Sequence, residues 1–171
     1  MPTNEEIILD VFEALERRDR KTLFDLWHDD IELHDAEPLP YADQAAGKQA
    51  MWKQLEEAPH KTWIGTWGPL QPTEAERRLD PRIVASRGEE VVVQYTTRAV
   101  SPDGERFESD VLGIYVIRDG QAALGQDVPL RHRRSLWLPR PCRGRAASAD
   151  RGLAGSRATA PGGSGRSNGD P

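Results

Sequence analysis

The chain has 171 residues, with 23 Lys and Arg against 28 Asp and Glu and a formal net charge of -5. This length predicts one domain with a modest extension. A single cysteine, Cys142, excludes a disulfide framework and a zinc site built from several cysteines. Because the sequence also lacks a signal-peptide pattern and an apolar run of about 20 residues, we expect a soluble, cytoplasmic protein.

The charge is distributed unevenly along the chain. Residues 1–120 carry 14 Lys and Arg against 25 Asp and Glu, a net charge of -11. Residues 121–171 carry nine Arg, no Lys and three Asp, a net charge of +6. Two compositions have therefore been joined, and we expect a domain over residues 1–125 followed by a disordered tail, rich in Arg, Gly, Pro and Ala, over residues 126–171.

Three helices are predicted in the first third of the chain. Thr3 and Glu6 have the spacing of a capping box, so a helix is expected over residues 4–18. Its apolar positions fall on one stripe: Ile7, Ile8, Val11, Phe12 and Leu15. Asp19 is placed to cap a second helix that ends near residue 29, and a third helix is expected over residues 47–57, before Pro59.

Strands are predicted from alternation and from β-branched composition. Residues 31–35 alternate with period two, the Trp-rich residues 62–67 are expected to be extended, and residues 90–100 and 107–117 form two further strands. The dipeptide Asp119-Gly120 is a hairpin signal that requires another strand after it. Residues 121–127 are poor in β-branched and aromatic residues, however, which leaves open that this last strand is missing.

This order of elements predicts an α+β fold. We expect one curved antiparallel sheet with the three N-terminal helices packed on one face. A curved sheet closed by helices forms a conical pocket, and pockets of this shape hold small molecules.

Several stretches resemble one family. The run Trp27-His28-Asp29-Asp30-Ile31-Glu32-Leu33-His34-Asp35, the loop Leu39-Pro40-Tyr41 and the helix start Gly47-Lys48-Gln49-Ala50 are similar to SnoaL-like polyketide cyclases. These belong to the nuclear transport factor 2-like superfamily, which includes ketosteroid isomerases. The resemblance covers about residues 4–120 and implies a cystatin-like roll, a homodimer and chemistry without a cofactor. The fold also hosts epoxide hydrolases, dehydratases and non-catalytic binders.

Asp35 is the first candidate for catalysis. It shares a predicted strand face with Ile31 and Leu33, where loss of solvation raises the pKa of a carboxylate towards that of a general base. The resemblance agrees, because the ketosteroid isomerase base lies at the end of this same strand. The alternative is a carboxylate that faces water or caps the following loop.

Asp110 is the second candidate. It shares a strand face with Leu112 and Ile114, and the resemblance implies an Asp from a late strand that donates a hydrogen bond to an oxyanion, which is a worked case for ketosteroid isomerase. Its spacing from the next turn differs from the family position, and the alternative is an exposed strand start. The tyrosine of that family's oxyanion hole has no counterpart, because Val11 stands there.

The remaining candidates are aromatic or histidine residues. Tyr41 and Tyr95 could replace the missing tyrosine, and three tryptophans could line an apolar cavity or belong to the core: Trp52, Trp63 and Trp67. His34 is adjacent to Asp35 in the predicted strand, so the two point to opposite faces. His34 is kept as a possible site residue, and no metal site is predicted because the spacing matches no familiar ligand pattern.

These features predict a small-molecule-binding domain that acts as a cofactor-independent isomerase or cyclase, with an Asp general base and an apolar or polycyclic carbonyl ligand. The alternatives are a non-catalytic ligand-binding or dimerisation domain, and an epoxide hydrolase or dehydratase. No membrane contact is expected, and nucleic-acid binding by the basic tail is a distant third class.

The Arg-rich tail has two interpretations. It is either a disordered basic segment, or a stretch translated in the wrong frame from about residues 120–126 onward. Codons that are allowed for residues 126–138, shifted by one base, encode Arg-Met-Phe-Pro-Phe-Asp-Thr-Ala-Ala-Val-Cys-Gly. That peptide resembles the end of a SnoaL-like domain, and the gene sequence tests this hypothesis directly.

Overall fold

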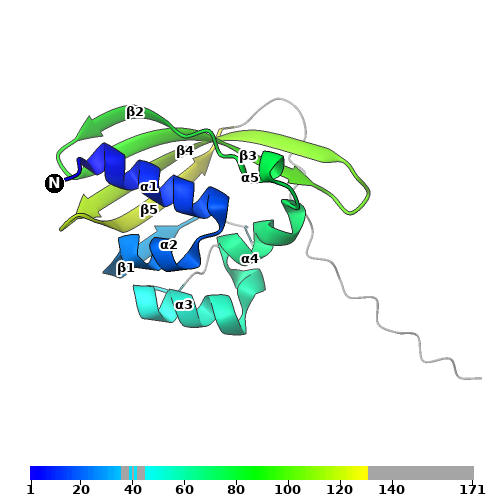
Figure 1. Ribbon diagram of the computed structural model, residues 1–171, viewed down its shortest axis with the longest axis horizontal. Coiled ribbons are helices and arrows are strands. Elements are labelled where there is room, and N and C mark those ends of the chain that lie inside the picture. Colours follow the sequence, from blue (N-terminus) through cyan, green and yellow to red (C-terminus); the bar gives the residue numbers. More distant parts are fainter. Residues whose placement is uncertain (36–38, 40, 42–44, 131–171) are drawn as a thin grey trace, which may run out of the picture. The chain divides into compact units, whose positions relative to one another are not determined.

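A computed structural model describes residues 1–35, 39, 41 and 45–130 (Figure 1). In chain order the helices and strands are α1 (Asn4–Arg17), α2 (Arg20–Leu26), β1 (Trp27–His34), α3 (Lys48–Glu57), α4 (Trp63–Trp67), α5 (Glu74–Arg77), β2 (Arg82–Arg87), β3 (Glu90–Val100), β4 (Arg106–Arg118) and β5 (Gln121–Pro129). Two 3-10 turns, Pro59–Lys61 and Gly68–Leu70, flank α4. Among these residues, no helix combines the length and the apolar character that crossing a bilayer would need.

Helix α1 begins as the sequence predicts. The Thr3 hydroxyl accepts a hydrogen bond from the Glu6 backbone N–H at 3.2 Å, and the Glu6 carboxylate accepts one from the Thr3 N–H at 2.7 Å. The predicted stripe is buried, with Ile8 and Phe12 almost without exposure. The helix ends at Arg17, and Arg18 takes the left-handed conformation that closes it.

The sheet is mixed rather than purely antiparallel. Its strand order is β1-β5-β4-β3-β2, in which β1 pairs with β5 in parallel and the other three pairs are antiparallel. The strand that the composition left in doubt is therefore present. β5 lies inside the sheet, between β1 and β4, and runs across the expected boundary at residue 125. β5 has few β-branched and aromatic residues, but its backbone is hydrogen-bonded to β1 on one side and to β4 on the other. This pairing stabilises the strand in spite of its composition.

Helix α1 contacts β3, β4 and β5 on one side of the sheet, here called the inner face (Figure 1). Residues of β3 alternate accordingly: Val91, Val93 and Tyr95 are buried, whereas Val92 and Gln94 between them are partly exposed. The main core lies between α1 and this face. The sheet and its helices thus form the layered α+β arrangement that the sequence predicts.

Two local predictions are wrong. The Trp-rich segment is helical, because the Thr62 hydroxyl caps α4 by accepting from the Gly65 N–H at 3.1 Å while donating to the Pro59 carbonyl at 2.8 Å. The second helix ends at Leu26 and not near residue 29, because β1 begins directly at Trp27. The third helix lies where it was expected.

Candidate functional site

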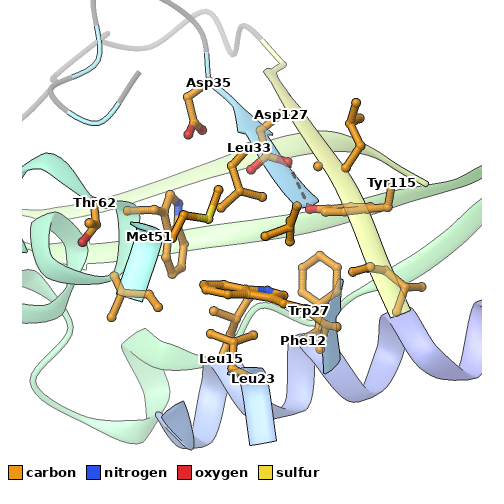
Figure 2. A pocket seen from close by; sticks show the side chains of 18 of the residues that line it. Phe12, Leu15, Leu23, Trp27, Leu33, Asp35, Met51, Thr62, Tyr115 and Asp127 are labelled. Carbon is orange, nitrogen blue, oxygen red and sulfur yellow. Dashed lines mark hydrogen bonds between the residues drawn. The ribbon is translucent and has the colours of Figure 1, made fainter. Parts of the chain in front are cut away.

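A cavity lies between the inner face of the sheet and helices α1, α3 and α4 (Figure 2). The volume that the centre of a water molecule can occupy inside the cavity is about 90 Å³. By the same measure, a single bound water needs roughly 10–15 Å³. The walls are mainly apolar: Ile8, Val11, Phe12, Leu15, Leu23, Trp27, Ile31, Leu33, Met51, Leu55, Trp63, Ile64, Leu79, Ala122 and Leu124. The space suits a small organic molecule better than a few ordered waters.

Two carboxylates lie side by side at one end of this cavity. In the β1–β5 pair, Leu33 is opposite Gly125 and His34 is opposite Gln126, so the next residues along, Asp35 and Asp127, are neighbours. Both line the cavity, and Figure 2 shows their carboxylates at the same end of it. Two phenols, Tyr95 and Tyr115, complete this polar end.

Asp127 is held by both phenols. The Tyr95 hydroxyl donates to Asp127 Oδ2 at 2.7 Å, and the Tyr115 hydroxyl donates to Asp127 Oδ1 at 3.0 Å. Burial raises the pKa of Asp127, and the two hydrogen bonds oppose that shift. Burial, and then the charge of Asp127, raise the pKa values of both tyrosines far above 10, so both remain hydrogen-bond donors at neutral pH.

Two glycines make room for the Tyr115 ring. A Cβ on Gly113 would lie 2.5 Å from Tyr115 Cε2 and Oη, and one on Gly125 would lie 2.9 Å from Leu33 Cδ2 and 3.2 Å from Tyr115 Cε1. The ring can therefore lie along the sheet and reach Asp127 only because both positions lack side chains. Glycine inside a strand signals such a close approach. The two glycines were the available sequence clue to Tyr115 and Asp127, neither of which was predicted as a site residue.

Of the predicted site residues, four line the cavity: His34, Asp35, Trp63 and Tyr95. Tyr41 and Trp67 lie outside its lining in a second apolar cluster, in which Trp67 Nε1 donates to Tyr41 Oη at 3.0 Å. Burial raises the pKa of Tyr41. These two side chains support the wall that Trp63 forms, because the Trp63 and Trp67 rings lie 6.3 Å apart.

The side chains of Trp52 and His34 make their main contacts with residues that do not line the cavity. The Trp52 ring packs edge-on against Phe24 at 5.1 Å, and its Nε1 donates to Glu56 at 3.0 Å. His34 borders the cavity, but its side chain is 54% exposed and its Nε2 lies 3.0 Å from Glu32 Oε2. The described residues contain no cluster of three or more potential metal ligands.

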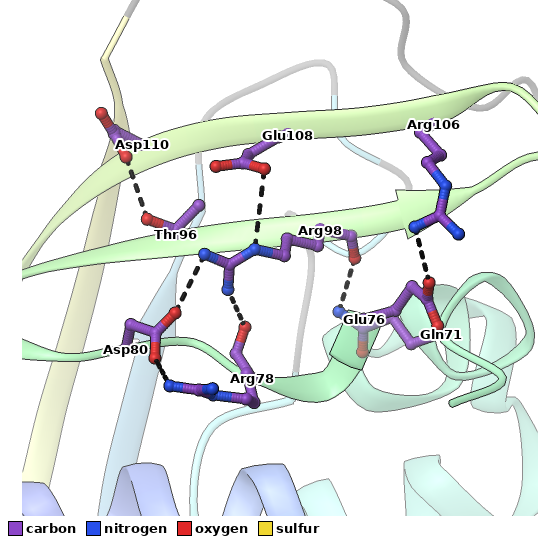
Figure 3. Close-up of polar contacts among 9 residues, drawn as sticks. All are labelled: Gln71, Glu76, Arg78, Asp80, Thr96, Arg98, Arg106, Glu108 and Asp110. Atoms are coloured by element: carbon purple, nitrogen blue, oxygen red, sulfur yellow. Dashed lines mark hydrogen bonds and ion pairs between the residues drawn. The ribbon is translucent and has the colours of Figure 1, made fainter. Parts of the chain in front are cut away.

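Asp110 lies on the opposite face of the sheet (Figure 3). It pairs in register with Thr96, whose hydroxyl donates to Asp110 Oδ1 at 3.0 Å, and it is not among the residues that line the cavity. The alternation of β4 explains this placement, since Val111 and Tyr115 face inward. The nearby polar residues form a separate network in which Arg98 pairs with Asp80 at 2.9 Å.

Comparison with protein-family models finds a match to the SnoaL-like domain over residues 8–124. This chain belongs to the SnoaL-like domain family. No curated protein matches it. The match ends three residues before Asp127, so one of the two carboxylates of this SnoaL-like domain lies outside the matched segment.

Solved structures share the fold of this SnoaL-like domain at low sequence identity. An NTF2-like protein of unknown function from Burkholderia pseudomallei is 18% identical, covering 76% of this chain and 92% of that one, with a TM-score of 0.59. A protein with a cystatin-like fold from Xanthomonas campestris is 15% identical over the same shares, with a TM-score of 0.60. TerC, crystallised with polyporic acid, is 24% identical over 74% and 91%, with a TM-score of 0.57.

Proposed function

We propose that this SnoaL-like domain binds a small, largely apolar carbonyl compound and moves a proton on it without a cofactor, as an isomerase or cyclase. The observation that carries the proposal is the placement of Asp35 at the polar end of an otherwise apolar cavity. A carboxylate there can reach a carbon atom of a bound ligand while the walls exclude water.

The proposed reaction begins with Asp35 as general base. Its carboxylate takes the proton from the carbon next to the carbonyl. The electron pair of that C–H bond forms the C=C bond of an enolate, and the π pair of the carbonyl moves onto its oxygen. In an isomerase the same proton returns to a different carbon. In a cyclase the enolate carbon instead attacks a second carbonyl of the ligand, and the proton goes to the new alkoxide.

The Tyr95–Asp127–Tyr115 group is suited to the oxygen of such an enolate. Burial raises the pKa of Asp127, which favours the protonated form that can donate a hydrogen bond. When two neighbouring carboxyl groups have different surroundings, the ionised one can act as the general base and the protonated one as a hydrogen-bond donor. Asp127 lies within β5 and accepts hydrogen bonds from two phenols, whereas Asp35 follows the end of β1, so their surroundings differ in this way.

The test measures proton exchange and does not require the natural substrate. Purified protein is incubated with small cyclic ketones in D₂O, and loss of the α-proton signal is followed by NMR. We expect exchange above the buffer rate, and a loss of about 10²- to 10⁴-fold in Asp35→Asn. Asp110→Asn is the matched control, because it makes the same change on the opposite face. Equal exchange in Asp35→Asn and the unaltered protein would refute the role of Asp35.

We also propose that the protein is a homodimer. The family resemblance implies a homodimer, and Val128 on β5 and Leu130 just after it, which are 44% and 40% exposed, are neighbouring apolar side chains that such an interface would cover. Sedimentation equilibrium measures the mass in solution. A Val128→Lys variant should shift it towards the monomer, and a monomeric unaltered protein would refute the proposal.

A further inference from the structure

We propose that this cavity binds a compact apolar amine in its protonated form, with the ammonium group at the end where Asp35 and Asp127 lie. The inference uses the same cavity as the proposed function but does not require catalysis. It follows from the charge that lines the cavity, from the hydrogen bonds already made there, and from the character of the walls.

The charged side chains that line the cavity are acidic. Among the described residues that line the cavity, the acidic side chains are Asp35 and Asp127, and none is lysine or arginine. Lys48 is not among the residues that line the cavity: its Nζ lies 2.9 Å from Asp29 and donates to the Trp27 carbonyl at 3.1 Å. A ligand cation is therefore favoured at this end of the cavity, and a ligand carboxylate is repelled.

Both oxygens of Asp127 already accept one hydrogen bond each, from the neutral phenols of Tyr95 and Tyr115. Without a ligand cation, burial favours the protonated carboxyl. A cation beside Asp127 would instead favour the ionised form, whose charge the neutral phenols do not balance. An ammonium group has three donors and could reach the remaining lone pairs of Asp127 and the carboxylate of Asp35, which lies beside it in the strand register.

Aromatic side chains form part of the cavity walls. Phe12, Trp27 and Trp63 line the cavity, and Tyr95 and Tyr115 stand at its polar end. The Phe12 ring packs edge-on against Tyr95 at 5.0 Å and Tyr115 at 5.7 Å, so the aromatic side chains are held in fixed positions. Aromatic faces attract cations as well as apolar groups, so these walls suit both the body and the head of an apolar amine.

The test uses three probes of matched shape: cyclohexylmethylamine, cyclohexylmethanol and cyclohexanecarboxylate. Binding to the full chain is measured by NMR titration at neutral pH. We expect the amine to bind about tenfold or more tightly than the alcohol, and the carboxylate to bind weakest. Raising the pH through the pKa of Asp127, while the amine stays protonated, should strengthen amine binding and leave alcohol binding unchanged.

The variants assign the effect to the two carboxylates. Asp127→Asn and Asp35→Asn should each weaken the amine by about tenfold or more and leave the alcohol within about threefold. Asp110→Asn removes the same charge from the opposite face and should change neither. Two carboxylate variants are included so that a folding defect in one, seen by thermal unfolding, leaves the other as the test.

The inference is overturned if the carboxylate probe binds as well as the amine, if none of the probes binds, or if Asp110→Asn weakens the amine as much as the cavity variants do. The outcome can be distinguished from failure of the proposed function. Ketone exchange without selective amine binding refutes only the amine site, and selective amine binding without ketone exchange refutes only the catalytic proposal.

Discussion

Replacing Tyr115 by Phe removes one hydroxyl and keeps the ring that lies over Gly113. The hydroxyl donates to Asp127 at 3.0 Å, and a hydrogen bond to a charged group contributes about 1.5–3 kcal/mol, against about 0.5–1.5 kcal/mol for a neutral pair. The variant should therefore lose about 1.5–3 kcal/mol of unfolding free energy where Asp127 is ionised, and less where it is protonated.

The direction of the pH dependence follows from the pKa of Asp127. In the folded protein this pKa lies above the unfolded value of 3.8, so the folded state holds the proton longer and stability falls as the pH rises from 3.8 through the folded pKa. Loss of a donor raises the folded pKa further. The free energy of unfolding of Tyr115→Phe should thus continue to fall over a wider pH range. The difference in this free energy between the variant and the unaltered protein should therefore increase with pH.

Urea unfolding at about pH 4.5 and about pH 8 measures this gap. Thr96→Val is the matched control, because it also removes a hydroxyl that donates to a carboxylate at 3.0 Å, but on the face of the sheet away from the cavity. Its effect on the free energy of unfolding should be smaller, since solvent screens this partly exposed pair. An equal loss for Tyr115→Phe at both pH values, or a gap that narrows with pH, would contradict the reasoning.

Three further predictions use the same unfolding assay. Phe12→Ala removes a ring that is 1% exposed and should cost about 3–5 kcal/mol; a cost below 1 kcal/mol would mean that the core collapses around the gap. Gly113→Ala should cost about 1–3 kcal/mol because its Cβ would lie 2.5 Å from the Tyr115 ring, and the cost should vanish in a Tyr115→Ala background. Asp127→Asn removes the group with the raised pKa, so its stability relative to the unaltered protein should increase between pH 4.5 and pH 8; a decrease would contradict the stated sign.

Local signals predicted the elements whose determinants are local. The capping box at Thr3 and the apolar stripe up to Leu15 fixed α1, and the Asp119-Gly120 turn correctly implied a strand after it. Asp35 was placed on the cavity side because alternation from Leu33 is a property of the strand itself. The family resemblance, drawn from the same segments, is confirmed by the family match.

Features that depend on distant partners could not be predicted. Residues 121–127 look unlike a strand, and only pairing with both β1 and β4 makes them one. Asp127 and Tyr115 were missed for the same reason, because their contact joins two strands across a pair of glycines. Asp110 was assigned to a face by alternation alone, which does not say which face of β4 meets the helices.

The frame hypothesis gains a concrete consequence from this site. The shifted peptide would place a methionine where Asp127 stands, and both phenols would then lose their acceptor. Residues 131–171, which make up most of the proposed tail, lie outside the described part of the chain. The codons of the gene decide the matter: codons incompatible with the shifted peptide would exclude the hypothesis.

The parallel pairing of β1 with β5 has a consequence for biosynthesis. Residue 27 pairs with residue 122, and among the described strands β1 has no other sheet partner. A growing chain therefore cannot complete the wall that carries Asp35 until β5 has left the ribosome. Contacts this distant in sequence slow folding, and a chain halted before Gln121 would expose the unpaired edges of both β1 and β4 to aggregation.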